Sequence, residues 1–180
     1  YDPTSGQIYA AGYNMNDAEV EGDEANAPFG IFTIDPATGD ATLVGQQEEH
    51  MLVSLMADAD GSLIGIDENG MLWEVSKWGG YLNYELLDME ITPLGVQSMA
   101  HDFGKGVSYW ASYTADNSGN GISKLIKFLR TPNWTYEKEA VGAIGTDSEI
   151  IGLYIDSNPL PKGAPAIVED LAVTAGASGV

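Results

Sequence analysis

The chain of 180 residues has a net charge of −20, no cysteine and a hydrophobic fraction of 44%. Disulfides, thiolate metal sites and cysteine nucleophiles are therefore excluded, and the excess of acids makes nucleic acid and anionic membrane surfaces poor partners. No apolar stretch is long enough for a membrane-spanning helix. The charge favours solubility outside the cell, and divalent-cation binding is the alternative.

Short segments of alternating apolar and polar residues follow one another along the chain in a repeating order. The first unit begins with 1–6, which matches the end of an Asp-terminated strand, and continues with strands at 7–14, 30–40 and 41–46. The second unit has its strands at 51–62, 63–69, 70–80 and 89–96. The third unit has them at 96–106, 107–114, 123–134 and 135–145, and a further first strand follows at 149–159.

These segments predict an all-β fold. They are rich in Ile, Val, Leu, Tyr and Trp with a period of two, and Asp-Pro, Asp-Gly and Gly-Gly turns separate them. No window has sustained helical periodicity. A unit length of roughly 45–50 residues matches four strands per blade of a β-propeller.

Two stretches carry a resemblance to a known class of proteins. "FTIDPATGDATLVG" (32–45) and "ADADGSLIGID" (57–67) resemble the repeats of bacterial secreted or surface β-propellers. The resemblance covers 1–157 and implies a fragment of about three four-stranded antiparallel blades, the first without its inner strand, on an extracellular or cell-surface protein. The remaining blades come from a longer chain or from a second copy; an open arc, with its exposed sheet edges, is the least favoured alternative.

The composition of the chain changes after the predicted propeller. Residues 158–165 belong to a proline-rich stretch without periodicity, which predicts a linker. Residues 166–180 resemble the first strand of a fibronectin type III or immunoglobulin-like domain. This order of modules is typical of secreted or surface-displayed proteins.

Propeller topology divides the connections between two faces. The turns that contain Asp2, Asp35, Asp58 and Asp102 belong to one face, where each Asp is predicted to cap its turn. Residues 58–62 look like the start of a calcium loop, but Asn69 stands where that loop needs a Glu, so a tight turn is predicted. The opposite face is the one that usually carries ligands.

This opposite face holds the candidate ligand-binding residues. Its long loop 14–28 is dense in acids, and calcium is the only cofactor that the loop suggests; a solvated loop without a cation is the alternative. Residues 46–50 and 115–121 lie on the same predicted face. The candidates are Asp17, Glu19, Glu21, Asp23, Glu24, Glu48, Glu49, His50, Asp116, Asn117 and Asn120.

The pattern favours a non-enzymatic binding or scaffolding module for a glycan, peptide or protein. The alternative is a propeller-type carbohydrate-active hydrolase or lyase whose catalytic residues lie largely outside this chain. We expect no hydrolytic carboxylate pair among Glu48, Glu49, Asp147 and Glu149, and no buried carboxylate with a strongly raised pKa.

The four tryptophans divide into two pairs. Trp73 and Trp110 lie within strands and are predicted to pack between blades. Trp78 and Trp134 lie in or beside turns, where packing and carbohydrate stacking are equally open.

Overall fold

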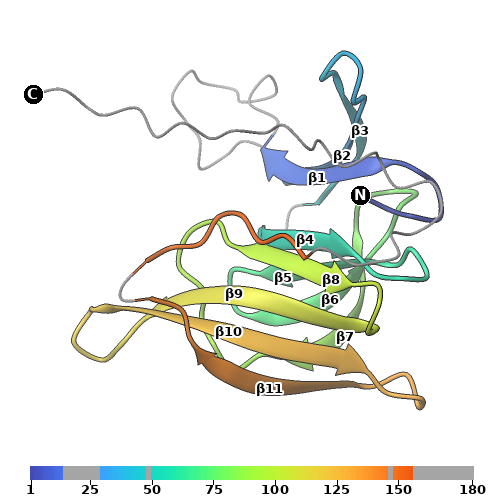
Figure 1. Cartoon of the computed structure of the whole chain (residues 1–180). Helices are drawn as coiled ribbons and strands as arrows, with labels where there is room; N and C mark the ends of the chain where they lie inside the picture. The colour runs from blue at the N-terminus through green and yellow to red at the C-terminus, as the bar shows by residue number, and fades with distance from the viewer. Residues whose placement is uncertain (14–28, 48–49, 146–147, 156–180) are drawn as a thin grey trace, which may run out of the picture.

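The computed structural model describes residues 1–13, 29–47, 50–145 and 148–155, and over these residues it contains strands and no helix (Figure 1). The all-β prediction is confirmed. No helix that could cross a membrane occurs within these ranges. The predicted acidic loop 14–28, linker 158–165 and fibronectin-like segment 166–180 lie outside them.

The described strands form three antiparallel sheets, and in each sheet every strand pairs with the next one along the chain. The first sheet contains β1 (Ile8–Tyr13), β2 (Phe29–Ile34) and β3 (Ala41–Gln47). The second contains β4 (Leu52–Ala57), β5 (Leu63–Asp67), β6 (Met71–Val75) and β7 (Leu82–Asp88). The third contains β8 (Ser98–Asp102), β9 (Val107–Ala115), β10 (Gly121–Arg130) and β11 (Tyr136–Ala143).

The second sheet lies between the other two and is most deeply buried at β5, whereas its outer strand β7 is exposed or half-buried. All five residues of β5 are buried, and Ile66 is 0% exposed. One apolar cluster joins the second and third sheets and consists of Met56, Ile64, Ile66, Leu72, Met89, Met99, Trp110, Ile126 and Phe128. Another joins the first and second sheets and consists of Phe29, Ile31, Leu52, Ala57, Leu63 and Val75.

The predicted packing of two tryptophans is confirmed. Trp110 is completely buried in the first of these clusters, and Trp73 packs against the second cluster while staying partly exposed. Trp78 and Trp134, in contrast, are 94% and 73% exposed. The Trp134 ring lies under the Arg130 guanidinium at 4.6 Å, so one of these two exposed rings already has a cationic partner.

The repeated Asp residues cap turns, as predicted. The Oδ1 atom of Asp2 accepts the backbone N–H of Thr4 at 2.9 Å, and that of Asp58 accepts the N–H of Ser62 at 3.0 Å. The Oδ1 atom of Asp102 accepts the N–H of two residues in its own turn in the same way. A carboxylate that folds back on its own turn satisfies amides that have no strand partner.

Two predicted strands were placed wrongly. The fourth strand of the second sheet is β7, at Leu82–Asp88, and not 89–96. Pro93 has no N–H to give to a ladder, and Glu90 has a φ of 55°, so this stretch leaves the sheet after β7 and crosses to β8. The alternating pattern of 82–88 was the better signal.

The second misplaced strand is the one predicted at 149–159. Its described part, 149–155, has no strand conformation. Its backbone bonds to a side chain instead, since the N–H of Leu153 donates to the Ser98 hydroxyl at 2.8 Å. Just before the segment, the Ser123 hydroxyl donates to the carbonyl of Ser148. A strand requires a neighbouring strand edge, and these contacts to hydroxyl groups do not supply one.

Candidate functional site

Two faces of the described structure can be compared as binding surfaces. We call the residues 50–51, 67–70, 93–97 and 116–120 the loop face, because they belong to connections between units or between second and third strands. We call 2–6, 35–40, 58–62, 76–81, 102–106 and 131–135 the turn face. The predicted candidates on the loop face are His50, Asp116, Asn117 and Asn120.

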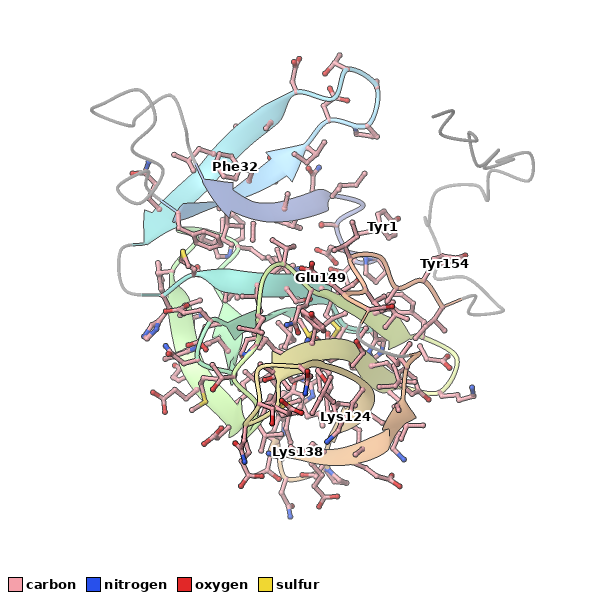
Figure 2. The ribbon with its side chains drawn as sticks, turned by 90° about the vertical axis from the view of Figure 1, so that its left-hand side faces the viewer. Tyr1, Phe32, Lys124, Lys138, Glu149 and Tyr154 are labelled. Atoms are coloured by element: carbon pink, nitrogen blue, oxygen red, sulfur yellow. The ribbon has the colours of Figure 1, made fainter. Side chains whose placement is uncertain are left out.

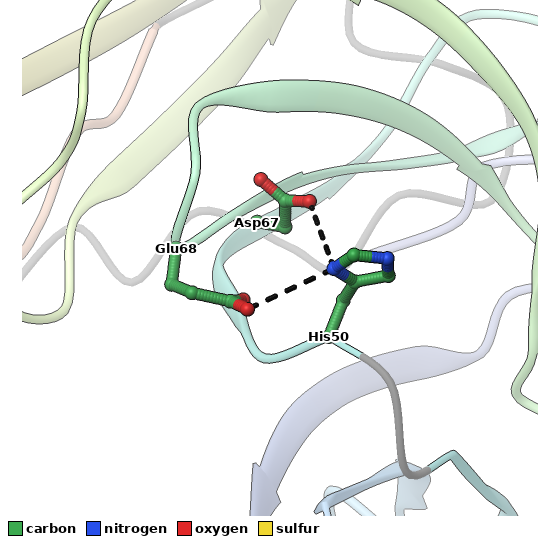
Figure 3. Close-up of side chains that lie close together, drawn as sticks. All are labelled: His50, Asp67 and Glu68. Carbon is green, nitrogen blue, oxygen red and sulfur yellow. Dashed lines mark ion pairs between the residues drawn. The ribbon is translucent and has the colours of Figure 1, made fainter.

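His50 lies beside two carboxylates of the β5–β6 turn (Figure 3). Its Nδ1 atom is 3.4 Å from Oδ2 of Asp67 and 3.7 Å from Oε1 of Glu68. One donor atom from each residue can be chosen so that all three lie within 4.8 Å of one another. The group therefore brings one imidazole and two carboxylates from two separate segments to one point.

The turn that carries Asp67 and Glu68 is fixed by its own sequence. Oδ1 of Asp67 accepts the backbone N–H groups of Asn69 and Met71 at 2.9 and 2.8 Å. Gly70 has a φ of 86°, and a Cβ atom there would overlap the carbonyl oxygen of Ile91. Only glycine fits this position, so the turn holds both carboxylates in place.

The segment that carries His50 is attached to the same turn. The N–H of Met51 donates to Oε2 of Glu68 at 2.6 Å, and the N–H of Glu68 donates to the carbonyl of Met51 at 2.9 Å. The His50 ring packs against the Trp73 ring at a centroid distance of 5.3 Å. These contacts position the imidazole toward the carboxylates.

The buried member of the group is Asp67, with 1% of its side chain exposed. Its Oδ2 atom accepts the indole N–H of Trp73 at 2.9 Å. Among the described residues, the only ion pairs of Asp67 and Glu68 are with His50, and no Lys or Arg reaches them. A buried carboxylate without a Lys or Arg partner is costly unless another cation or strong hydrogen bonds compensate it.

A hollow of about 440 Å³ adjoins this group. Glu68 belongs to both, and the walls come from β1, β4 and the loop before β8. Its lining residues are Tyr9, Ala10, Ala11, Gly12, Phe29, Met51, Leu52, Val53, Ser54, Leu55, Glu68, Pro93, Gly95, Val96 and Gln97. The hollow is large enough for a small ligand and combines apolar walls with a few polar groups.

The other predicted loop-face residues are not joined to this group. Asp116, Asn117 and Asn120 lie in the β9–β10 turn of the third sheet. Oδ1 of Asp116 accepts the N–H of Ser118 at 2.7 Å, and the Asn120 side-chain amide donates to Oδ2 at 3.0 Å. The Asn120 hydrogen bond and the backbone bonds lower the pKa of Asp116. The Asp116 carboxylate and the Asn120 amide therefore form hydrogen bonds within their own turn.

Most of the predicted acids cannot be placed. Asp17, Glu19, Glu21, Asp23, Glu24, Glu48 and Glu49 lie outside the described residues. Asp147 does as well, so the absence of a hydrolytic pair on the loop face stays a prediction. Glu149 is described, and its carboxylate lies against Gly95, near the middle of the molecule in Figure 2.

A second group of ionisable side chains lies on the turn face. Asp58 and Asp60 adjoin the guanidinium of Arg130, which bonds to Asp60 and lies 3.9 Å from Oδ2 of Asp58. Burial, together with the hydrogen bond and charge of Asp60, raises the pKa of Asp58 to about 7. The prediction that no buried carboxylate has a strongly raised pKa is therefore wrong.

The main cause of this shift is burial, which the packing of the β4–β5 turn against the end of β10 brings about. Arg130, far from Asp58 in the sequence, meets it there, and its positive charge partly offsets the raised pKa. Asp58 also lines a cavity of about 180 Å³ together with His101 and Tyr136. Burial lowers the pKa of His101 and raises that of Tyr136 to about 12.

Sequence reasoning missed Asp67, Glu68 and the role of Asp58. A signal for the first two was present, because "DENG" (67–70) is the connection between a second and a third strand and so belongs to the face that holds His50. The signal for Asp58 was absent, since its turn has the same sequence features as other capped turns.

The chain matches no protein-family model and no curated protein.

Proposed function

We propose that the three sheets are successive blades of a β-propeller. The shared meander order of the sheets supports this, as does the packing of β4 against β8, since first strands of neighbouring blades lie together in a propeller. The first sheet has three strands. An inner strand, from a longer chain or a second copy, would pair with β1 on the edge opposite β2.

The function that we propose is binding without catalysis. The chain would belong to an extracellular or cell-surface bacterial protein and recognise a glycan, a peptide or another protein through the loop face. The observation that carries this proposal is the position of His50, Asp67 and Glu68 at the border of the 440 Å³ hollow. Apolar walls beside a few fixed polar groups are typical of ligand sites.

A binding screen with two matched variants tests this proposal. The wild-type chain, the loop-face variant H50A/E68Q and the turn-face variant W78A would be applied to a glycan array and a random peptide library. We expect at least one ligand that the loop-face variant loses and that W78A retains. Binding that is lost only in W78A, or binding that both variants retain, would overturn the proposal.

A hydrolase or lyase is the second candidate function, and one observation favours it. The carboxyl of Asp58 has a pKa of about 7 and lines the 180 Å³ cavity together with His101 and Tyr136, so it can hold a proton at neutral pH as a general acid must. Assays on polysaccharides with the wild type and D58N test this candidate. Polysaccharide cleavage that D58N abolishes would support the enzyme over the binding module.

A further inference from the structure

The group of His50, Asp67 and Glu68 has the composition of a transition-metal site. Imidazole nitrogen suits zinc, copper, iron and nickel, and carboxylate oxygen completes many zinc sites. Calcium takes six to eight oxygen ligands, so a site built around a nitrogen donor is a poor calcium site. The calcium suggested by the acidic loop is therefore not the cation that this group selects.

Two of the three distances between donor atoms match those around a small ion. Ligands about 2.1 Å from a tetrahedral zinc ion lie roughly 3.4 Å from one another. The Nδ1 atom of His50 is 3.4 Å from Oδ2 of Asp67 and 3.7 Å from Oε1 of Glu68, and Figure 3 shows it directed at both carboxylates. The donor atoms of Asp67 and Glu68 lie within 4.8 Å of each other, so an ion in contact with all three requires at most that these two carboxylates approach each other.

The surroundings of the donors also fit. The indole N–H of Trp73 donates to the Asp67 carboxylate, and the N–H of Met51 donates to Glu68, so both carboxylates are held by groups outside the donor set. Such outer contacts orient ligands in known metal sites. A divalent ion would also compensate the charge of Asp67, which is buried and has no Lys or Arg partner among the described residues.

We propose that His50, Asp67 and Glu68 bind one divalent first-row transition-metal ion, with zinc as the best fit. Three protein donors leave a coordination position open for a ligand atom. Glu68 borders the adjoining hollow, so a carboxylate or hydroxyl oxygen of a ligand bound there could complete the coordination. The inference rests on the proposed function only in this last step, because the ion itself requires nothing but the three side chains.

Titration calorimetry with Zn²⁺ on the chain without an affinity tag tests the site. Because the chain is strongly acidic, the titration is run at moderate salt with Ca²⁺ and Mg²⁺ as comparison ions. The variants are H50A and E68Q, which leave the Asp67 turn cap intact, and the control is E85Q in the outer strand β7. Circular dichroism shows that each variant is folded.

We expect one saturable Zn²⁺ site that H50A weakens by about tenfold or more, E68Q also weakens, and E85Q leaves unchanged. The imidazole resonances of His50 should shift on adding Zn²⁺. Equal Zn²⁺ binding by the wild type and H50A, or no shift of these resonances, would overturn the site. If His50 only forms an ion pair with Asp67, its imidazole resonances should not shift on adding Zn²⁺.

The screen above separates the two proposals when it is repeated with EDTA. If ligand binding by the loop face persists in EDTA, the proposal that the metal contacts the ligand is contradicted, and the proposal of a binding module is still supported. If zinc binds as predicted but the loop-face variant retains every ligand that the wild type binds, the metal site is supported and binding through the loop face is rejected.

Discussion

The raised pKa of Asp58 predicts that the variant D58N is more stable than the wild type at pH 8. Asp58 is 7% exposed, and its pKa lies at about 7, above the usual 3.8. Between these values the folded state keeps a proton that the unfolded chain has lost. The contribution of this group to stability therefore falls as the pH rises through that range, and the loss is complete above about pH 7.

The structure sets the size of this effect. A shift of about three pKa units corresponds to roughly 4 kcal/mol, as an upper value for one group. The hydrogen bond that raises the pKa of Asp58 also lowers that of Asp60, and this offset within the pair reduces the effect, so we expect D58N to raise the free energy of unfolding at pH 8 by about 1–3 kcal/mol. Asn is neutral at every pH, and its Oδ1 can still accept the N–H groups of Asp60 and Ser62 that bond to Asp58.

Urea unfolding at pH 5 and pH 8 measures the effect. D58N and the wild type should differ less at pH 5, where only part of this loss has occurred, than at pH 8, where it is complete. The control is D35N, in an exposed turn where Oδ1 accepts the N–H of Ala37 at 2.8 Å, and its difference from the wild type should be the same at both pH values. Equal destabilisation by D58N at both pH values would refute the reasoning.

Two further variants test the buried ion pair and the turn of the candidate site. Asp2 is 0% exposed, and its carboxylate lies 2.6 Å from the Lys77 ammonium. The variant K77M should therefore leave a buried carboxylate with a weaker set of partners and lower the free energy of unfolding by about 3 kcal/mol. A loss below ~0.5 kcal/mol would mean that the ion pair contributes little to stability. G70A places a Cβ against Ile91 at a positive φ and should cost about 2–4 kcal/mol, whereas G39A, which has a similar φ and open space, should cost about 1 kcal/mol. Equal losses of unfolding free energy in G70A and G39A would contradict the close contact between position 70 and Ile91.

Local sequence patterns were enough to predict most of the strands. The period of two and the Asp-containing turns located β5 and β9, because hydrophobic alternation and turn chemistry act within a few residues. They failed at 89–96, where the apolar residues looked like a strand but Pro93 prevents one. They also failed at 149–155, because strand formation there depends on a partner and not on the sequence of the segment alone.

The candidate site was predictable only in part. His50 was found because it lies in a connection between two repeats, and the same topological rule applied to 67–70 would have added Asp67 and Glu68. The contact of Arg130 with Asp58 could not be found in this way, since it depends on how two sheets pack. The raised pKa of Asp58 follows from burial, which no short sequence pattern encodes, and from the neighbouring Asp60, whereas the Arg130 charge opposes it.

Hydrogen–deuterium exchange of the chain, with and without a ligand recovered from the arrays, tests the central claim most directly. If the loop face is the binding surface, the ligand should slow exchange in 50–53, 67–70 and 93–97 and leave 58–62 and 131–135 unchanged. Slower exchange confined to 58–62 and 131–135 would contradict the claim and place recognition on the turn face beside Asp58.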